Sequence, residues 1–121
     1  MTEPAADAFR RVGPSDAIPN DFVVPYYLDD RKARISIARV RDRLYAFDDL
    51  CTCAREVCPL SGGLLTGTTI MCQCHGSRFD ITTGAVISGP ATEALHVYQV
   101  HEVEGSIQVR ADLPRPRSTG R

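Results

Sequence analysis

The chain lacks several features that would assign it to a large class of proteins. No run approaches the roughly 18 apolar residues that a membrane-spanning helix requires, so we expect no membrane anchor. Residues 1–11 begin acidic and contain no apolar segment, which is unlike a signal peptide. The net charge of −1, from 14 basic and 15 acidic residues, gives no case for nucleic-acid binding. These absences favour a cytoplasmic protein.

Helical periodicity and internal repeats are absent as well. Instead, short segments that alternate apolar and polar residues are separated by Pro, Gly and Asp, a pattern that predicts short strands. Pro25 falls inside one of these segments and indicates an edge strand or a bulge there. The expected strands cover residues 9–12, 21–28, 34–40, 44–47, 68–73, 78–81, 85–88, 95–102 and 106–109.

Length and composition fit one small domain. A chain of 121 residues is too short for a second core, and 43% hydrophobic with 24% charged residues is ordinary for a globular protein. We expect a single domain over residues 1–112. The remaining residues, 113–121, are rich in Pro, Arg, Ser and Gly and are predicted to form a disordered tail.

Five cysteines lie close together in the middle of the chain. Cys51 and Cys53 form one pair, and the segment 72–75 reads Cys-Gln-Cys-His. Thiolate and imidazole ligands suit zinc or an iron–sulfur cluster, whereas calcium and magnesium require oxygen ligands. Buried or disulfide-bonded cysteines without a metal are the alternative, but both groups lie among turn residues rather than in apolar runs. The pattern predicts a metal site.

The residues around these cysteines carry a family resemblance. In order, the chain reads Cys-Thr-Cys, Cys-Pro-Leu-Ser-Gly-Gly-Leu-Leu-Thr-Gly, Cys-Gln-Cys-His-Gly-Ser-Arg-Phe-Asp, Thr-Thr-Gly-Ala-Val and Gly-Pro-Ala. The segment 51–91 thereby resembles a Rieske [2Fe-2S] domain, in which a Cys-x-His loop, a Cys-x-x-His loop and a proline-bearing third loop surround the cluster. The resemblance implies one [2Fe-2S] cluster and an all-β fold. This fold is an antiparallel two-sheet sandwich or barrel with a small cluster-binding lobe at about residues 49–91.

One departure from the family pattern changes the ligand set. Cys53 stands where the family has its first histidine. The resemblance therefore implies Cys51, Cys53, Cys72 and His75 as ligands, with Cys51 and Cys72 on the inner iron. The spacer between the two ligand pairs is slightly longer than usual, so Cys58 in place of Cys53 is the alternative ligand.

The resemblance also implies roles for residues beside the ligands. In Rieske proteins of respiratory cytochrome bc complexes, cysteines at the places of Cys58 and Cys74 form a disulfide. Because structural disulfides are uncommon in a reducing cytosol, two buried thiols remain the alternative. Ser77 is placed like the family serine whose hydroxyl bonds a cluster sulfide, and Gly89 and Pro90 of the third loop are expected to contact the cluster.

The inferred ligand set predicts a low reduction potential. The oxidised core carries two positive charges, so three thiolates and one imidazole leave a net negative charge where the usual set leaves none. The potential should fall from the usual Rieske range, roughly −150 to +300 mV, toward the plant-ferredoxin value near −400 mV. Phe79 stands where respiratory Rieske proteins have a tyrosine that bonds a ligand sulfur, and this loss acts in the same direction.

With all four ligand positions filled by protein, the cluster has no open site for substrate. We expect an electron carrier rather than an enzyme. It would pass single electrons from a flavin-dependent ferredoxin reductase to a terminal oxygenase, either a ring-hydroxylating enzyme or a cytochrome P450. The alternatives are a cluster donor or redox sensor, a structural zinc domain, and the small Rieske-like subunit of a reductase such as nitrite reductase.

An apolar rim around His75 would suit docking of such partners. Its expected members either form this rim or simply pack the lobe, and the sequence leaves both possibilities open. They are Pro59, Leu60, Leu64 and Leu65.

Overall fold

Short antiparallel strands make up nearly all of the regular structure. The computed structural model describes residues 9–28, 33–50, 52, 59–74, 76–89 and 91–110. Within these residues two short 3-10 turns, η1 (Ser15–Ala17) and η2 (Leu60–Gly62), accompany the strands. The strands are β1 (Phe9–Pro14), β2 (Phe22–Leu28), β3 (Ala33–Val40), β4 (Arg43–Asp48), β5 (Leu64–Thr66), β6 (Thr69–Met71), β7 (Arg78–Asp80), β8 (Val86–Ser88), β9 (Val97–Tyr98), β10 (Val100–Val103) and β11 (Ser106–Arg110).

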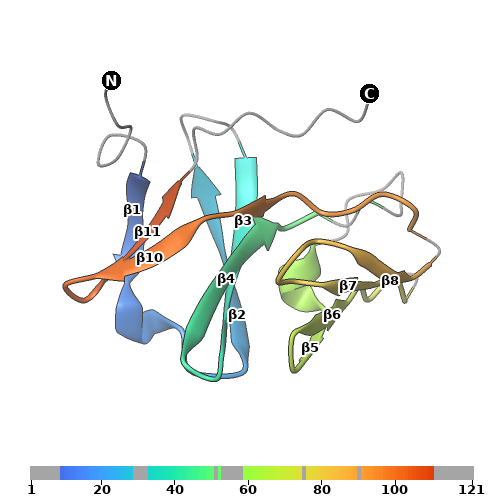
Figure 1. Ribbon diagram of the computed structural model, residues 1–121, viewed down its shortest axis with the longest axis horizontal. Helices are drawn as coiled ribbons and strands as arrows, with labels where there is room; N and C mark the ends of the chain where they lie inside the picture. Colours follow the sequence, from blue (N-terminus) through green and yellow to red (C-terminus); the bar gives the residue numbers. More distant parts are fainter. Residues whose placement is uncertain are drawn as a thin grey trace.

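The strands form three antiparallel sheets. One has the order β1-β11-β10, the second β2-β3-β4-β9, and the third β5-β6-β7-β8. We call the first two sheets the body and the third, together with η2, the lobe. Figure 1 shows the lobe beside β4, on the side of the molecule away from β1 and β11. The predicted all-β, two-sheet architecture with a small separate lobe is confirmed.

β3 lies at the centre of the molecule and buries both of its faces. Because side chains alternate along a strand, its odd-numbered residues Ile35 and Ile37 enter one core, and Ala38 and Val40 enter another. The first core lies between the body sheets and the second lies against the lobe. The body core comprises Ile18, Leu28, Ile35, Ile37, Ala46, Tyr98, Ile107 and Val109. The lobe core comprises Ala38, Val40, Phe47, Leu60, Ile70, Cys72, Phe79, Ile81, Ala91 and Leu95.

Two details of the strand prediction are wrong. β5 was missed, because a three-residue strand is too short to show alternation. The segment 95–102 was expected as one strand, but it divides at Gln99 as the chain crosses from the second sheet to the first. Pro25 lies in β2, an edge strand, as predicted. Residues 113–121, the predicted tail, lie outside the described residues.

No helix in the described part of the chain is long and apolar enough to cross a membrane.

Candidate metal centre

The second predicted ligand loop begins in the lobe core. Cys72 follows β6 and is fully buried. Its amide donates a hydrogen bond to the Ser77 carbonyl (2.8 Å), and its carbonyl accepts one from the Gly76 amide (3.0 Å). Gly76 has a φ of +82°, which a glycine adopts without strain and which closes the turn. The turn therefore directs the Cys72 side chain inward.

Ser77 joins this turn to the third loop. Its side chain is fully buried, and its Oγ accepts a hydrogen bond from the Ala91 amide (2.9 Å). A serine hydroxyl has one proton to donate, and no described residue accepts it here. The proton is available to a group held between the loops, as expected if the hydroxyl bonds a cluster sulfide.

The first loop is held as well, through the stretch that follows the third loop. Thr52, between the two predicted ligands of the first loop, donates its hydroxyl to the Glu93 carbonyl (2.6 Å). The Leu95 amide bonds the Gly84 carbonyl (2.8 Å), where a Cβ on Gly84 would clash with the Leu95 carbonyl. The first contact joins the first loop to the stretch that follows the third, and the second joins that stretch to the turn between β7 and β8.

The described residues include only part of the predicted site. Cys72 and Ser77 lie on the same turn, and Gly89 lies exposed just after β8. Within the described ranges no three His, Cys, Asp or Glu side chains gather where they could hold a metal ion. The other predicted site residues, Cys51, Cys53, His75 and Pro90, lie outside these ranges.

Cys74 is exposed and disulfide-bonded. Two buried thiols were the alternative to the Cys58–Cys74 bridge, and at Cys74 this alternative is wrong. Cys58 lies outside the described residues, so the pairing itself stays a prediction.

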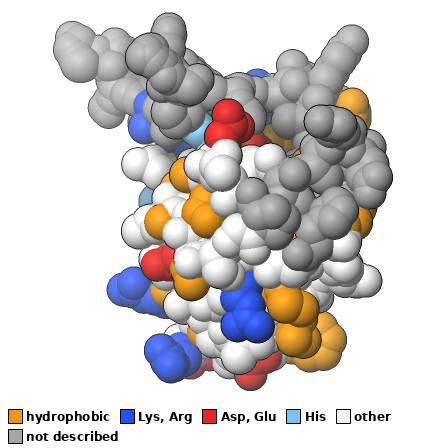
Figure 2. Space-filling view, turned by 90° about the vertical axis from the view of Figure 1, so that its right-hand side faces the viewer, with side chains coloured by type: hydrophobic (Ala, Val, Ile, Leu, Met, Phe, Trp, Pro, Cys, Tyr) orange, Lys and Arg blue, Asp and Glu red, His pale blue; other side chains and the backbone are white. Residues whose placement is uncertain are grey.

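Two residues predicted for the apolar rim lie in or against the lobe core, and His75, around which the rim was expected, lies outside the described residues. Leu60 is fully buried and Leu65 packs half-buried against the lobe core, so these two leucines stabilise the lobe. Leu64 is 58% exposed and lines a shallow pocket of about 160 Å³ with Met71 and Arg78. Figure 2 shows hydrophobic side chains beside a basic one on this side of the molecule.

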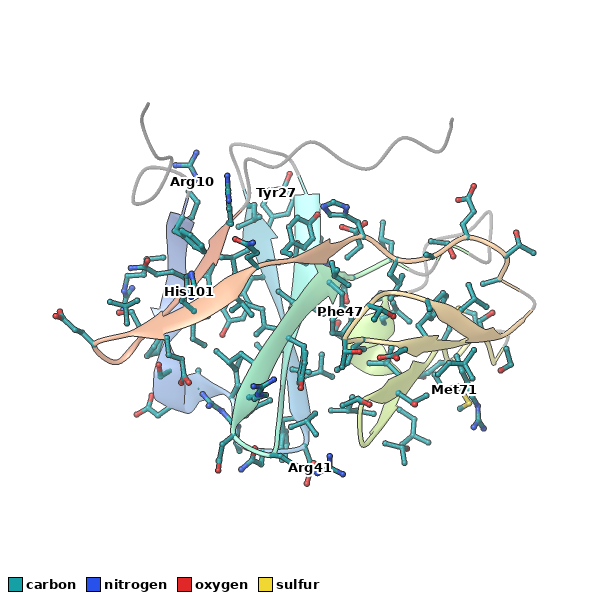
Figure 3. The ribbon with its side chains drawn as sticks, viewed as in Figure 1. Arg10, Tyr27, Arg41, Phe47, Met71 and His101 are labelled. Carbon is teal, nitrogen blue, oxygen red and sulfur yellow. The ribbon has the colours of Figure 1, made fainter. Side chains whose placement is uncertain are left out.

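Sequence reasoning missed one polar residue beside the site. Asp49 is fully buried and lies two positions before Cys51. The sequence does indicate that Asp49 is buried. Phe47 and Asp49 share one face of an extended chain, and Phe47 is plainly a core residue. In Figure 3, Phe47 lies between β4 and the lobe.

Comparison with known proteins identifies the family. The Rieske [2Fe-2S] domain model matches residues 9–99. Ferredoxin CarAc of Metapseudomonas resinovorans is 38% identical over 80 residues, which span 66% of this chain and 73% of that protein. The ferredoxin component of the naphthalene 1,2-dioxygenase system of Pseudomonas aeruginosa is 35% identical over 79 residues, 65% of this chain and 72% of that protein.

A solved structure is similar over most of its length. It is described as the complex of reduced oxygenase and oxidized ferredoxin in carbazole 1,9a-dioxygenase. A chain of that structure aligns with a TM-score of 0.77 at 30% identity, covering 85% of this chain and 93% of the other. The similarity thus extends from the sequence motifs to the arrangement of the sheets.

The described residues fit the cofactor that defines this family. A buried cysteine and a buried serine hydroxyl with a proton to donate lie on one turn, and thiolate with hydrogen-bond donors is the environment of an iron–sulfur cluster. Ser77 joins the second of the family's three loops to the third, and Thr52 joins the first to the stretch that follows the third. The chain belongs to the Rieske [2Fe-2S] domain family and carries one [2Fe-2S] cluster.

Proposed function

We propose that this protein is the ferredoxin of a multicomponent oxygenase system. The observation that carries the proposal is its similarity, above 30% identity, to the ferredoxin component of a dioxygenase system. The similar solved structure, in which a ferredoxin is in complex with an oxygenase, supports it. The protein passes single electrons from a flavin-dependent ferredoxin reductase to a terminal oxygenase, and it does so in the cytoplasm.

The ligand set completes the proposal. Cys51, Cys53, Cys72 and His75 hold the cluster, which supplies one-electron chemistry when bound. Ser77 donates its hydroxyl toward the cluster, since its oxygen already accepts from Ala91. These residues leave no open position for substrate, so the protein carries electrons and the oxygenase performs the reaction on the organic molecule.

The third thiolate lowers the reduction potential of the cluster. An electron added to an anionic cluster is less favourable than one added to a neutral cluster, so the potential lies below the usual Rieske range of roughly −150 to +300 mV. A low potential suits a protein that must reduce an oxygenase containing its own iron centres. The buried Phe79, which has no hydroxyl to donate, acts in the same direction.

Two assays separate this function from cluster donation. The purified holoprotein is first mixed with NADH, a flavin-dependent ferredoxin reductase and cytochrome c, and the reduction of cytochrome c is followed by its visible absorbance. In the second assay it is mixed with an apo-ferredoxin, and cluster transfer is followed by the visible spectrum. A carrier reduces cytochrome c repeatedly and retains its iron, whereas rapid cluster transfer with negligible electron transfer would reject the proposal.

A further inference from the structure

A buried carboxylate lies at the base of the first cluster loop. Asp49 directly follows β4 and has no exposed surface. Its Oδ1 accepts hydrogen bonds from the Ser36 hydroxyl (2.6 Å) and from the Ser61 amide (2.8 Å). Its Oδ2 lies 2.5 Å from the Nε of Arg34. One side chain thereby contacts the central strand of the body and the turn that follows the loop.

The backbone of Asp49 connects the same two places. Its amide donates to the Arg34 carbonyl (3.0 Å), and its carbonyl accepts from the Leu60 amide (2.5 Å). Next to it, Leu50 and Pro59 form an isolated antiparallel bridge. The residues that flank the segment 51–58, which holds two predicted ligands, are therefore brought together at Asp49.

Two partners of the Asp49 side chain, Ser36 and Arg34, come from one face of β3. Arg34 and Ser36 are even-numbered and lie on the face of the strand that is turned to the lobe, with Ala38 and Val40. β3 is paired along most of its length on both sides, by β2 and β4, whereas β4 meets the two-residue strand β9 on its other side, so β3 is the most extensively paired strand of its sheet. Asp49 thus joins a rigid strand to the base of a loop.

Stability alone does not account for a carboxylate in this position. Burying a charge costs free energy that an ion pair rarely more than recovers, and an apolar residue would fill the same space at no such cost. A carboxylate can fix the positions of its partners, because its two oxygens accept several hydrogen bonds at preferred angles. At Asp49 the hydrogen bonds to Oδ1 come from Ser36 of β3 and from Ser61 of η2. The ion pair at Oδ2 is with Arg34 of β3.

We propose that Asp49, held by Arg34 and Ser36, is a positioning residue that fixes both ends of the first cluster loop to β3. The proposal rests on the assignment of Cys51 and Cys53 as ligands and does not depend on which proteins exchange electrons with the cluster. Asp49 acts through the loop, because its side-chain contacts are with β3 and η2. Its loss should loosen the loop while the body sheets stay as they are.

The test compares Asp49→Ala with Asp48→Asn in the holoprotein. Asp48 is the matched control, because it is the adjacent carboxylate and its Oδ1 accepts from Tyr98 of the body (2.6 Å). Three quantities are measured: hydrogen exchange at the Ser61 amide, the rate of iron loss to a chelator, and the electron paramagnetic resonance spectrum of the reduced cluster. Exchange at Ile35 and Ile37 reports on the body.

Without the carboxylate, the Ser61 amide loses its acceptor and the loop loses its anchor. Both amide exchange and iron loss should rise on the order of tenfold in Asp49→Ala, with broadened resonance lines. Body amides should change less than twofold, and Asp48→Asn should resemble the wild type. If body and lobe amides accelerate equally, Asp49 only stabilises the fold and the proposal is wrong.

A second variant covers the case in which Asp49→Ala does not fold. Arg34 is 46% exposed, so Arg34→Gln leaves a soluble surface and removes one of the three partners of the carboxylate. It should raise iron loss severalfold, and Arg34→Lys, which keeps the charge, should recover part of the effect. Iron loss at the wild-type rate in Arg34→Gln would contradict the role of Arg34.

If Ser61 exchanges faster in Asp49→Ala without any change in iron loss or line shape, the loop does not hold the cluster and the positioning role fails, while electron transfer can be tested separately.

Discussion

The two faces of β3 are joined to their neighbours in different ways. On the body side, strands of four to six residues such as β1, β10 and β11 pair along most of their length and enclose an apolar core with β3. On the lobe side, β5 to β8 have three residues each. There the connections between loops are made by single polar contacts from Asp49, Thr52 and Ser77.

This difference indicates which part of the molecule depends on the cofactor. Strands of three residues form too few ladder bonds to be stable by themselves, so the lobe needs packing against β3 and β4 and cross-links between its loops. Cys74 is disulfide-bonded, and we expect this disulfide and the cluster to act as such cross-links. The body has a continuous core and needs neither. Loss of the cluster should therefore open the lobe and leave the body folded.

The largest expected effect comes from removing a predicted ligand. Cys53→Ala should lose or severely destabilise the cluster, because three ligands remain for two irons. Hydrogen exchange should then rise at the lobe residues Ile70 and Phe79, while Ile35 and Ile107 of the body keep their protection.

The matched variant for this position is Cys53→His. It rebuilds the usual two-histidine ligand set, so it should retain the cluster, raise the reduction potential and add a second pH-dependent step to it. Redox titration followed by visible absorption measures both. An unchanged spectrum in Cys53→Ala, together with cluster loss in Cys58→Ala, would assign the ligand role to Cys58.

A pair of core substitutions should separate the lobe from the body. Phe79 and Ile107 are both fully buried, one in each core. Phe79→Ala should cost about 3–5 kcal/mol and Ile107→Ala about 2–5 kcal/mol, since each leaves a cavity. We expect Phe79→Ala to release iron faster at temperatures where the body sheets are intact. Ile107→Ala should lower the temperature at which the body unfolds. Equal effects of both variants on iron release and on body unfolding would show that the two cores unfold together.

Much of the fold could be predicted from the chain itself. Alternation located β2, β3 and β4, and Pro25 marked the edge strand, because these features depend on neighbours in sequence. The division of residues 95–102 into β9 and β10 could not be predicted. It depends on the chain passing from one sheet to another at Gln99, which is decided by packing between distant segments.

The predicted site shows the same limit. Cys72 and Ser77, both predicted site residues, lie on one turn that their own segment of sequence forms, whereas their role at a cluster stays a prediction. The burial of individual leucines was harder to predict, because Leu60 and Leu64 are equally apolar. Only the direction of the chain after η2 buries Leu60 and exposes Leu64. Asp49 differs from Asp48 only in the face of the strand on which it lies.

A smaller effect is expected from replacing Arg39, whose guanidinium bonds two carbonyls of the body. Arg39 lies on the opposite face of β3 from Arg34, and its side chain is 13% exposed. Its Nε donates to the Ile18 carbonyl (2.6 Å), and one Nη donates to the Ser15 carbonyl (2.9 Å). Arg39→Gln should destabilise the body by about 1–2 kcal/mol, because two carbonyls lose charged donors. Iron loss should be unchanged, in contrast to Arg34→Gln.

Thermal unfolding of the body, with Arg43→Gln as the control for loss of an exposed charge, measures this effect. Arg43 lies on β4 and is exposed. An Arg39 variant that released iron as fast as an Arg34 variant would remove the distinction between the two faces.

The smallest expected effect concerns acid pH and the partner of Arg39. Glu102 on β10 accepts from both terminal nitrogens of Arg39, one at 2.8 Å and the other at 3.3 Å. The hydrogen bond from Arg39 lowers the pKa of Glu102 below its ordinary value of 4.5, although partial burial opposes the shift. The same hydrogen bond raises the pKa of Arg39, which stays charged throughout.

Since the pKa of Glu102 is lower in the folded protein, the unfolded state binds its proton first as the pH falls. Glu102 therefore contributes stability above pH 4.5, and this contribution is lost as the pH falls through the lower folded value. With 37% of the side chain exposed, solvent screening keeps the effect below about 1 kcal/mol.

The unfolding temperature of the wild type should exceed that of Glu102→Gln at neutral pH, and the difference should vanish in acid. Acid release of the cluster affects both proteins alike and cancels in the difference. A constant difference across this pH range would mean that Glu102 contributes by packing rather than by its charge.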